Sequence, residues 1–216
     1  MHSESLRISE IFYSLQGESR TSGLPTVFVR LTGCPLRCSW CDTEYAFSGG
    51  ERRTLDSILQ QVAGYGAKYV CVTGGEPLAQ PGCLLLLERL ADAGYEVSLE
   101  TSGALDLAEV DARIVKVMDL KAPGSGEVEK NRYQNIQHLD RKDQVKFVIA
   151  DRADYDWSAS KLIEYDLAEK VSDVLFSPVS TGVEPAELAE WILADRLPVR
   201  FQIQLHRVIW GDKTGV

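Results

Sequence analysis

The chain has 216 residues, a formal net charge of −9 and a hydrophobic fraction of 44%. This length suits one domain with a sizeable core, and we expect a single domain over residues 1–216. No apolar run approaches the roughly 20 residues that span a bilayer, and the acidic balance argues against a nucleic-acid surface, which needs clustered Lys and Arg. The N-terminal sequence lacks the basic start and apolar stretch of a secretory signal, so we expect a cytoplasmic protein.

Short β-branched runs alternate with longer helical patterns from residue 26 onward. The strands are expected at residues 26–31, 68–72, 96–100, 114–119, 144–149, 174–176 and 200–205. The helices are expected at residues 55–63, behind the candidate N-cap Thr54, and at 82–93 and 185–194, with weaker patterns at 128–139 and 159–170. This alternation is typical of repeated β-α units, and it predicts an α/β fold around a parallel sheet.

Unusual residues follow directly after several of these strands. The segments are the cysteine-rich stretch after Leu31, TGGEP after Val72, ETSG from Glu100, DLK after Met118 and SPVS after Phe176. The carboxyl ends of parallel strands converge on one face of an α/β barrel, where the active site is normally built. We therefore expect these segments to meet around one site.

Three of the five cysteines, Cys34, Cys38 and Cys41, lie within the stretch LTGCPLRCSWCDT. Such close spacing does not suit a disulfide framework, so thiolate chemistry in a reducing compartment is expected. A structural zinc ion would need a fourth protein ligand. An iron–sulfur cube can take three thiolates and leave its fourth iron open to a ligand that is not protein. The pattern favours the cube, and zinc stays open as the alternative.

The CxxxCxxC motif at residues 34–41, with GGEP at residues 74–77, resembles the radical S-adenosylmethionine (SAM) superfamily. Further motifs resemble one branch of it, the 7-carboxy-7-deazaguanine synthase family of queuosine and 7-deazapurine biosynthesis. They are YSLQGE at residues 13–18, CDT at 41–43, LETSG at 99–103 and QLH at 204–206. The resemblance implies a partial, TIM-like radical SAM barrel with mostly parallel strands.

The resemblance also implies an activity, that of a carbon–nitrogen lyase. In the family, the open iron of a [4Fe-4S] cluster chelates SAM, and the reduced cluster cleaves it to a 5′-deoxyadenosyl radical. The radical abstracts hydrogen from C6 of 6-carboxy-5,6,7,8-tetrahydropterin, which contracts to 7-carboxy-7-deazaguanine with loss of ammonia. The implied partners are Mg²⁺ beside this pterin substrate, a reducing electron donor such as flavodoxin or ferredoxin, and a second copy of the chain in a homodimer.

By the same resemblance, Cys34, Cys38 and Cys41 would ligate the cluster and Thr43 would offer its hydroxyl to Mg²⁺, which prefers oxygen ligands. An N-cap or turn role is the alternative for Thr43. Arg30 would pair with the substrate carboxylate, which its fork geometry suits. The remaining implied substrate contacts are Leu15, Gln16, Gly17, Thr73, Glu100 and His206.

The implied cofactor contacts begin with Gly74 and Gly75, which would admit the methionine part of SAM, and Glu76, which would be available to its ammonium group. The others are Asp119, Lys121, Ser177, Pro178, Val179 and Ser180. Many family members carry Ser-Pro-Lys where this chain has Asp119-Leu120-Lys121. The cofactor contact implied by the resemblance therefore applies to Lys121 more directly than to Asp119 or Leu120. The DLK sequence also occurs in glycyl-radical activating enzymes, which stay open as an alternative, and a non-catalytic zinc-binding module is the third interpretation.

Overall fold

The computed structural model describes residues 5–211 together with residues 213 and 215. Nine strands form one sheet in the order β3-β1-β2-β4-β5-β6-β7-β8-β9. The strands are β1 (Ser5–Leu15), β2 (Pro25–Leu31), β3 (Glu51–Thr54), β4 (Tyr69–Gly74), β5 (Glu96–Thr101), β6 (Val115–Leu120), β7 (Gln144–Ile149), β8 (Asp173–Pro178) and β9 (Arg200–Phe201). The helices are α1 (Leu55–Gly64), α2 (Gly82–Asp92), α3 (Arg152–Glu164), α4 (Leu167–Lys170), α5 (Pro185–Asp195) and α6 (Leu205–Trp210).

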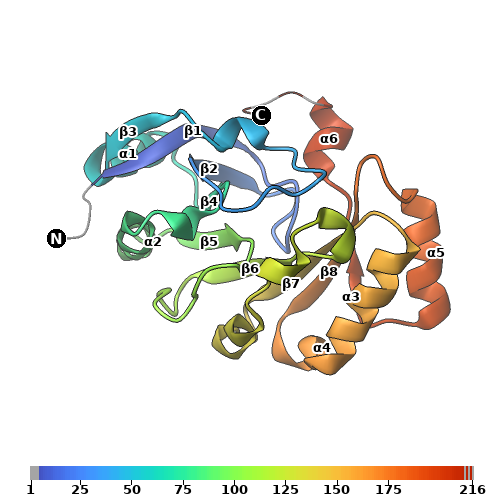
Figure 1. Cartoon of the computed structure of the whole chain (residues 1–216). Helices are drawn as coiled ribbons and strands as arrows, with labels where there is room; N and C mark the ends of the chain where they lie inside the picture. Colours follow the sequence, from blue (N-terminus) through green and yellow to red (C-terminus); the bar gives the residue numbers. More distant parts are fainter. Residues whose placement is uncertain (1–4, 212, 214, 216) are drawn as a thin grey trace.

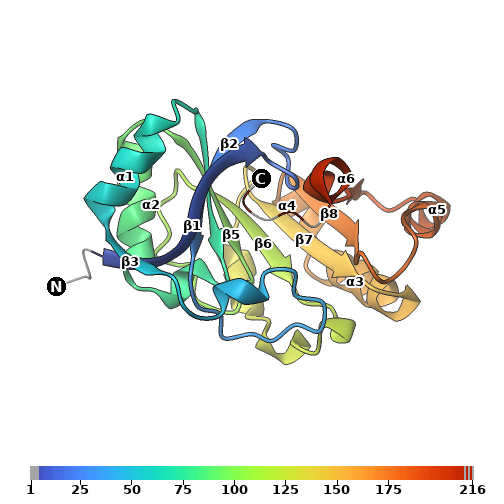
Figure 2. The same ribbon diagram turned by 90° about the horizontal axis from the view of Figure 1, so that it is seen from above.

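The sheet is mostly parallel and does not close. All neighbours from β2 through β4 to β9 pair in parallel, whereas β1 runs antiparallel to both β2 and β3. In Figure 1, α1 and α2 lie along the first half of the curved sheet and α3, α4 and α5 along the second half. Figure 2 shows the same curvature from above, with β1 crossing at one side of the opening. The predicted α/β partial barrel is confirmed.

Burial on both faces explains why the parallel strands are short apolar runs in the sequence. The central residues of β4 and β8 are buried without interruption, as expected for strands that are covered on both faces. Helix α1 begins where predicted, because the Thr54 side chain accepts a hydrogen bond from the Ser57 amide at 3.2 Å. Gly94, with φ 87°, follows the end of α2, a conformation that glycine adopts without strain.

Both of the weaker helix predictions need correction. Residues 128–139 form only short 3-10 turns, Val128–Lys130 and Tyr133–His138. Buried Asn135 lies in the second turn and donates to the carbonyls of Gly103 and Leu105, at 2.8 and 2.6 Å, so its side chain holds this segment against a neighbouring loop. The segment 159–170 is divided between α3 and α4, and α3 begins earlier, capped by Asp151.

The two ends of the described chain also differ from the prediction. The pattern gives no strand before residue 26, but β1 occupies residues 5–15, with intermediate burial along most of its length. Because it mixes polar and aromatic residues, it lacks the alternation that marks a strand. At the other end, the expected strand 200–205 is limited to the two residues of β9, after which α6 begins.

No helix among the described residues is long and apolar enough to cross a membrane.

Candidate active site

The carboxyl-terminal ends of the parallel strands open into a cavity of about 380 Å³. It is bounded by the loop after β2, which carries the three cysteines, and by the loop after β1 together with α6. Every site residue predicted from the sequence lines this cavity except Glu76. The expected convergence of strand-end segments is therefore observed, as in other parallel barrels.

The cysteine loop is anchored by backbone hydrogen bonds around its three thiols. The Gly33 amide donates to the Ala46 carbonyl at 2.7 Å, and the Gly33 carbonyl accepts from the Glu76 amide at 2.8 Å. Farther along, the Ser39 amide and hydroxyl donate to the carbonyls of Ser125 and Gly124, at 3.0 and 2.7 Å. The loop is thus fixed to both β4 and β6 at their carboxyl ends.

Cys34, Cys38 and Cys41 are free, partly exposed thiols on the cavity wall. Burial is the largest influence on each, and it raises the pKa of all three thiols above the ordinary value, against the attraction of Lys121. Without a metal they hold their protons at neutral pH, so metal binding must release protons. Among residues 5–211, 213 and 215, no three Cys, His, Asp or Glu side chains converge on a point for one metal ion; the thiolates of a cube each ligate a different iron.

Gly74 and Gly75 bring β4 against the cysteine loop. Gly74 has φ 153°, in a region that favours glycine. A Cβ on Gly75 would collide with the Gly33 carbonyl and lie 2.7 Å from Cys34 Cβ. This contact requires glycine because the two backbones lie closer than any side chain allows.

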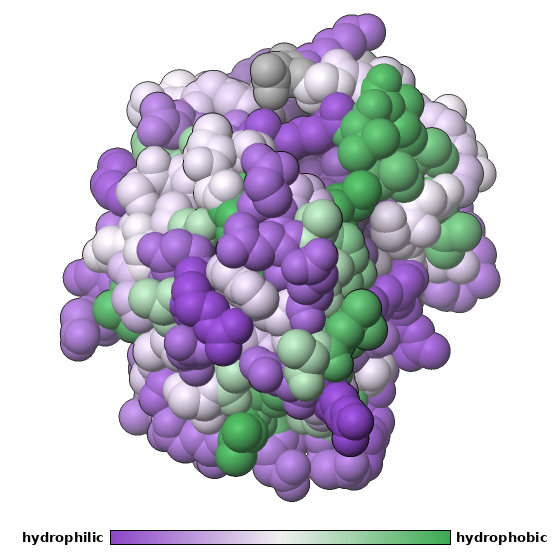
Figure 3. Space-filling view, turned by 90° about the vertical axis from the view of Figure 1, so that its right-hand side faces the viewer, coloured by the Kyte–Doolittle hydropathy of each residue, from purple (hydrophilic) through white to green (hydrophobic). Residues whose placement is uncertain are grey.

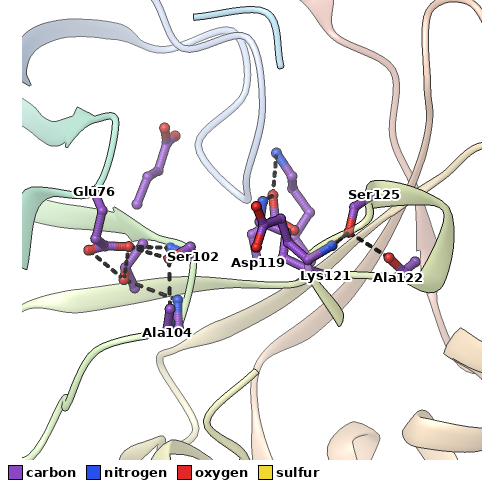
Figure 4. Close-up of polar contacts among 12 residues, drawn as sticks. Glu76, Ser102, Ala104, Asp119, Lys121, Ala122 and Ser125 are labelled. Atoms are coloured by element: carbon purple, nitrogen blue, oxygen red, sulfur yellow. Dashed lines mark hydrogen bonds and ion pairs between the residues drawn. The ribbon is translucent and has the colours of Figure 1, made fainter. Parts of the chain in front are cut away.

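Glu76 has a different place from the one expected. Its side chain is fully buried, and its carboxylate accepts hydrogen bonds from the Thr101 hydroxyl at 2.9 Å and from the Ser102 amide and hydroxyl at 2.7 and 2.5 Å. The Leu78 amide is a further donor at 3.1 Å. Figure 4 shows Glu76 directed at Ser102 and separated from Asp119 and Lys121. The carboxylate joins β4 to β5 and is not open to a ligand, so we withdraw the predicted contact with the SAM ammonium.

The predicted substrate contacts from different strands meet at one end of the cavity. Thr73 donates to Glu100 Oε2 at 2.9 Å, and Gln16 Nε2 donates to Glu100 Oε1 at 3.2 Å. Arg30 is the register partner of Thr73 on the neighbouring strand. Phe12 and Phe28 stack with ring centroids 4.9 Å apart and line the same cavity. Polar groups and an aromatic pair together suit a flat heterocycle with a polar edge.

Arg30 is held by two residues that the sequence prediction did not include. Its Nε donates to Glu10 Oε1 at 2.7 Å, and the Tyr45 hydroxyl donates to the same oxygen at 2.7 Å. Burial is the largest influence on the Tyr45 phenol, and it raises the pKa of this group to about 12. Tyr45 therefore stays neutral, and Arg30 stays a cation facing the cavity.

The C-terminal helix closes the cavity against the loop after β1. The Leu205 amide donates to the Gly17 carbonyl at 2.9 Å, and any Cβ on Gly17 would collide with the ring of His206. Ser19 and Gln202 exchange two hydrogen bonds of 2.8 Å each. Gln204 Nε2 donates to Glu18 Oε1 at 2.8 Å and to Asp42 Oδ2 at 3.0 Å. These contacts place His206 beside Gly17.

Asp119 and Lys121 face the cavity from the end of β6. Lys121 Nζ lies 3.0 Å from Asp119 Oδ2, while Asp119 Oδ1 is buried and has no hydrogen-bond partner among the described residues. An unpartnered buried oxygen costs free energy unless a ligand satisfies it. Three thiols on one wall and a free carboxylate oxygen on the next fit an iron–sulfur cluster with a polar cofactor. The segment 177–180 lines the cavity nearby.

Thr43 lies on the cavity wall between the cysteines and the polar groups. Its hydroxyl donates to Asp42 Oδ1 at 2.9 Å, and it makes no side-chain hydrogen bond as the cap of the following 3-10 turn. The N-cap alternative therefore lacks its defining contact.

Several lining residues were missed by the sequence prediction. They are Glu18, Asp42, Tyr45, Lys146, Gln204 and Arg207. Glu18, Asp42 and Gln204 lie inside the motifs YSLQGE, CDT and QLH, and Lys146 stands in the middle of the apolar strand QVKFVI, so each of these four had a local signal. Tyr45 and Arg207 are ordinary polar residues, identified only by the segments that they contact.

Comparison with known proteins identifies the family. The model of the radical SAM superfamily matches residues 28–121. A 7-carboxy-7-deazaguanine synthase from Koribacter versatilis is 44% identical, over 97% of this chain and 99% of the relative. The synthase of the same name from Chlorobaculum tepidum is 46% identical, over 98% of this chain and 97% of the relative. The chain belongs to the 7-carboxy-7-deazaguanine synthase family.

A solved structure shares the fold of this chain. The crystal structure of QueE from Escherichia coli matches with a TM-score of 0.78, over 94% of this chain and 96% of that chain, at 23% identity. Membership of the synthase family makes this chain a radical SAM enzyme, with a [4Fe-4S] cluster and SAM as its cofactors. It also decides against the glycyl-radical activating enzyme and the zinc module.

Proposed function

We propose that the chain converts 6-carboxy-5,6,7,8-tetrahydropterin into 7-carboxy-7-deazaguanine and ammonia. The observation that carries this proposal is the division of one cavity into a wall of three thiols and a facing group of polar and aromatic side chains. Relatives named for this product match almost the full chain at 44% and 46% identity. A shared cavity lets the two ligands react without contact with bulk water.

The substrate end of the cavity supports a pterin with a carboxylate. We assign the carboxylate to Arg30, because Glu10 occupies only its Nε and the planar guanidinium can offer further N–H donors. We assign the ring edge to Leu15, Gln16 and Gly17, and the ring face to the apolar wall. Thr73, Glu100 and His206 complete the substrate contacts.

The cofactor end supports the cluster and SAM. Cys34, Cys38 and Cys41 would ligate three irons, and the bound pair supplies the radical that removes hydrogen from the substrate. Gly74 and Gly75 line the cavity beside the cysteine loop, and we assign the methionine part of SAM to their backbone. Asp119 Oδ1 is available to a hydroxyl donor of the cofactor, with Lys121, Ser177, Pro178, Val179 and Ser180 around it.

We further propose that Thr43 binds Mg²⁺ beside the substrate. Its hydroxyl lines the cavity and lies next to the carboxylate of Asp42. Mg²⁺ favours oxygen ligands and usually keeps several waters, so one hydroxyl with a nearby carboxylate suits it.

We also propose a cytoplasmic homodimer that receives electrons from a flavodoxin or ferredoxin. Free cysteines suit a reducing compartment. Figure 3 views the side of the molecule where α5 and α6 lie, and apolar patches interrupt its mainly hydrophilic surface. The exposed apolar residues of these elements are Leu193, Val208 and Ile209. Sedimentation analysis would test the dimer, and a protein monomeric at working concentration would contradict it.

The test of the activity is anaerobic reconstitution with iron and sulfide, followed by incubation with SAM, Mg²⁺, a reductant and 6-carboxytetrahydropterin. We expect 7-carboxy-7-deazaguanine and ammonia in equal amounts. SAM cleavage without this product would contradict the proposal. Cys38→Ala should lose both iron and product. Cys83→Ala, which removes a buried core thiol on α2, should retain both and serves as the matched control.

A further inference from the structure

Lys146 is a half-buried cation in the cavity to which the resemblance assigns no role. It lies in the middle of β7, where its Cα is the register partner of Asp119 on β6. Its side chain lines the cavity and is 16% exposed. An unpaired cation is expensive at this depth, so its partners determine what it does.

The ammonium of Lys146 lies between two carboxylates from different elements, the loop after β1 and the carboxyl end of β6. It forms an ion pair and hydrogen bond with Glu18 Oε2, and it lies 3.7 Å from Asp119 Oδ2. Glu18 directly follows the segment 15–17, which we assign to the substrate ring. Asp119 carries the unpartnered oxygen that we assign to the cofactor. A single charged group therefore contacts both binding regions.

Glu18 and Asp119 each have a second partner. Because these two partners differ, Lys146 is the group that connects the two carboxylates. Glu18 Oε1 accepts from Gln204 at 2.8 Å, and Asp119 Oδ2 pairs with Lys121 at 3.0 Å. Neither of these partners contacts the other carboxylate. Without the ammonium of Lys146, Glu18 and Asp119 would repel each other across a poorly hydrated space.

The charge state of Lys146 argues against a role in proton transfer. Burial is the largest influence and lowers the pKa of Lys146, but attraction to Glu18, Asp119 and Glu100 outweighs it and holds the pKa well above the ordinary value. A group that retains its proton so strongly is a poor acid at neutral pH. Its contribution is a fixed positive charge with fixed geometry.

We propose that Lys146 is a positioning residue that holds Glu18 at the substrate end and Asp119 at the cofactor end in one shared geometry. This proposal rests on the proposed function, since it assigns the two ends to those ligands. It makes Lys146 a determinant of affinity for both ligands, although it is assigned contact with neither.

The chain offers a matched control for the loss of an ion-paired lysine. Lys116 lies on β6 with its side chain 4% exposed, and its Nζ is 3.0 Å from Asp143 Oδ2. It does not line the cavity. Lys116→Met and Lys146→Met each remove the charge of a lysine from an ion pair, and Lys116 is the more deeply buried of the two, but only Lys146→Met touches the binding regions.

The experiment compares cluster-loaded wild type, Lys146→Met, Lys146→Arg and Lys116→Met, with iron content measured for each. We expect Lys146→Met to raise both the Kd for SAM and the KM for 6-carboxytetrahydropterin by about tenfold or more, since a buried carboxylate loses its partner. Lys146→Arg should recover much of the loss because it keeps the charge. Lys116→Met should leave both constants within about twofold of wild type, because distant substitutions act independently.

Equal constants for Lys146→Met and Lys116→Met would overturn the proposal. Product formation by the wild type would in that case still support the proposed function. Failure of the wild type to form product would instead refute the proposed function, while equilibrium binding of SAM would still test Lys146.

A second arm covers the case in which Lys146→Met does not fold. Glu18→Gln keeps an oxygen toward Gln204 and removes the charge that Lys146 holds. In the Glu18→Gln background, Lys146→Arg should change the substrate KM by a smaller factor than it does in wild type, because the two residues act through one contact. Equal factors in both backgrounds would overturn the proposal.

Discussion

Replacing Glu76 with alanine tests whether this motif residue supports the fold or contacts the cofactor. The fully buried carboxylate accepts from two backbone amides, those of Leu78 and Ser102, and from the hydroxyls of Thr101 and Ser102. In Glu76→Ala these donors lose their acceptor. The hydroxyls can rotate toward other acceptors, whereas the amides are fixed by the backbone.

The magnitude follows from the two amides. Each buried N–H left without an acceptor costs about 1–3 kcal/mol, so the pair costs about 2–6 kcal/mol. A central value of about 4 kcal/mol lowers the Tm of a chain of this length by about 8–16 °C. This is a large part of the roughly 5–15 kcal/mol that stabilises a typical folded domain.

Urea denaturation of the cluster-free protein under anaerobic, reducing conditions measures this loss. The matched control is Glu88→Ala, which removes an exposed carboxylate on α2 and should change the free energy of unfolding by less than about 0.5 kcal/mol. If Glu76→Ala unfolded at the same urea concentration as Glu88→Ala but bound SAM more weakly in the cluster-loaded form, the carboxylate would act on the ligand and our reasoning would be refuted.

Three other predictions concern the walls of the cavity. Gly75→Ala should displace the cysteine loop and lower iron content after reconstitution, whereas Gly64→Ala, with open space at its Cβ, should bind iron normally; equal iron in both would contradict the close contact. Thr43→Ala should raise the Mg²⁺ concentration needed for half-maximal turnover without changing iron content, and an unchanged Mg²⁺ response would remove Thr43 from the metal site. Burial is the largest influence on Glu18 and raises its pKa, but the attraction of Lys146 outweighs burial and brings the pKa below the usual 4.5. The Glu18–Lys146 pair therefore stabilises the fold above about pH 4.5, and this contribution is lost as the pH falls through the lowered pKa. Urea titrations between pH 6 and pH 3 should show a steeper loss for wild type than for Glu18→Gln, and parallel losses would contradict this assignment.

Local sequence patterns were sufficient for the parallel half of the fold and for the places where its loops carry chemistry. Buried β-branched runs such as β4 and β7 differ clearly from the helical segments between them. Glycine and cysteine motifs at the strand ends then pointed to one face of the sheet. The cavity forms there because parallel strands must end at the same edge.

The direction of individual side chains could not be predicted from these patterns. Glu76 follows two glycines, whose backbone conformation turns the chain, so strand alternation no longer applies to it. Its carboxylate bonds to Thr101 and Ser102 on the next strand. Such a contact depends on how two strands pack, which a motif does not encode.

The polar residues of the cavity were missed for the same reason, because their contacts join segments that lie far apart in the sequence. Glu18 meets Lys146 and Gln204 across separations of 128 and 186 residues. The local sequence around Glu18 does not indicate whether Lys146 and Gln204 lie next to it in the folded chain. The first strand was missed for a related reason, because β1 is specified by its pairing with β2 and β3 more than by alternation of its own.

The docking of the C-terminal segment onto the loop after β1 has a consequence for synthesis of the chain. Ser19 and Gln202 are separated by 183 residues, so the cavity cannot be completed until the ribosome has synthesised the chain as far as Gln202 and this residue has emerged. At roughly 5–20 residues per second, that interval lasts about 10–40 s. During it, Cys34, Cys38 and Cys41 have already been translated but lack the wall that shields them. A cluster delivered before the chain has emerged as far as Gln202 would therefore meet solvent instead of a finished site.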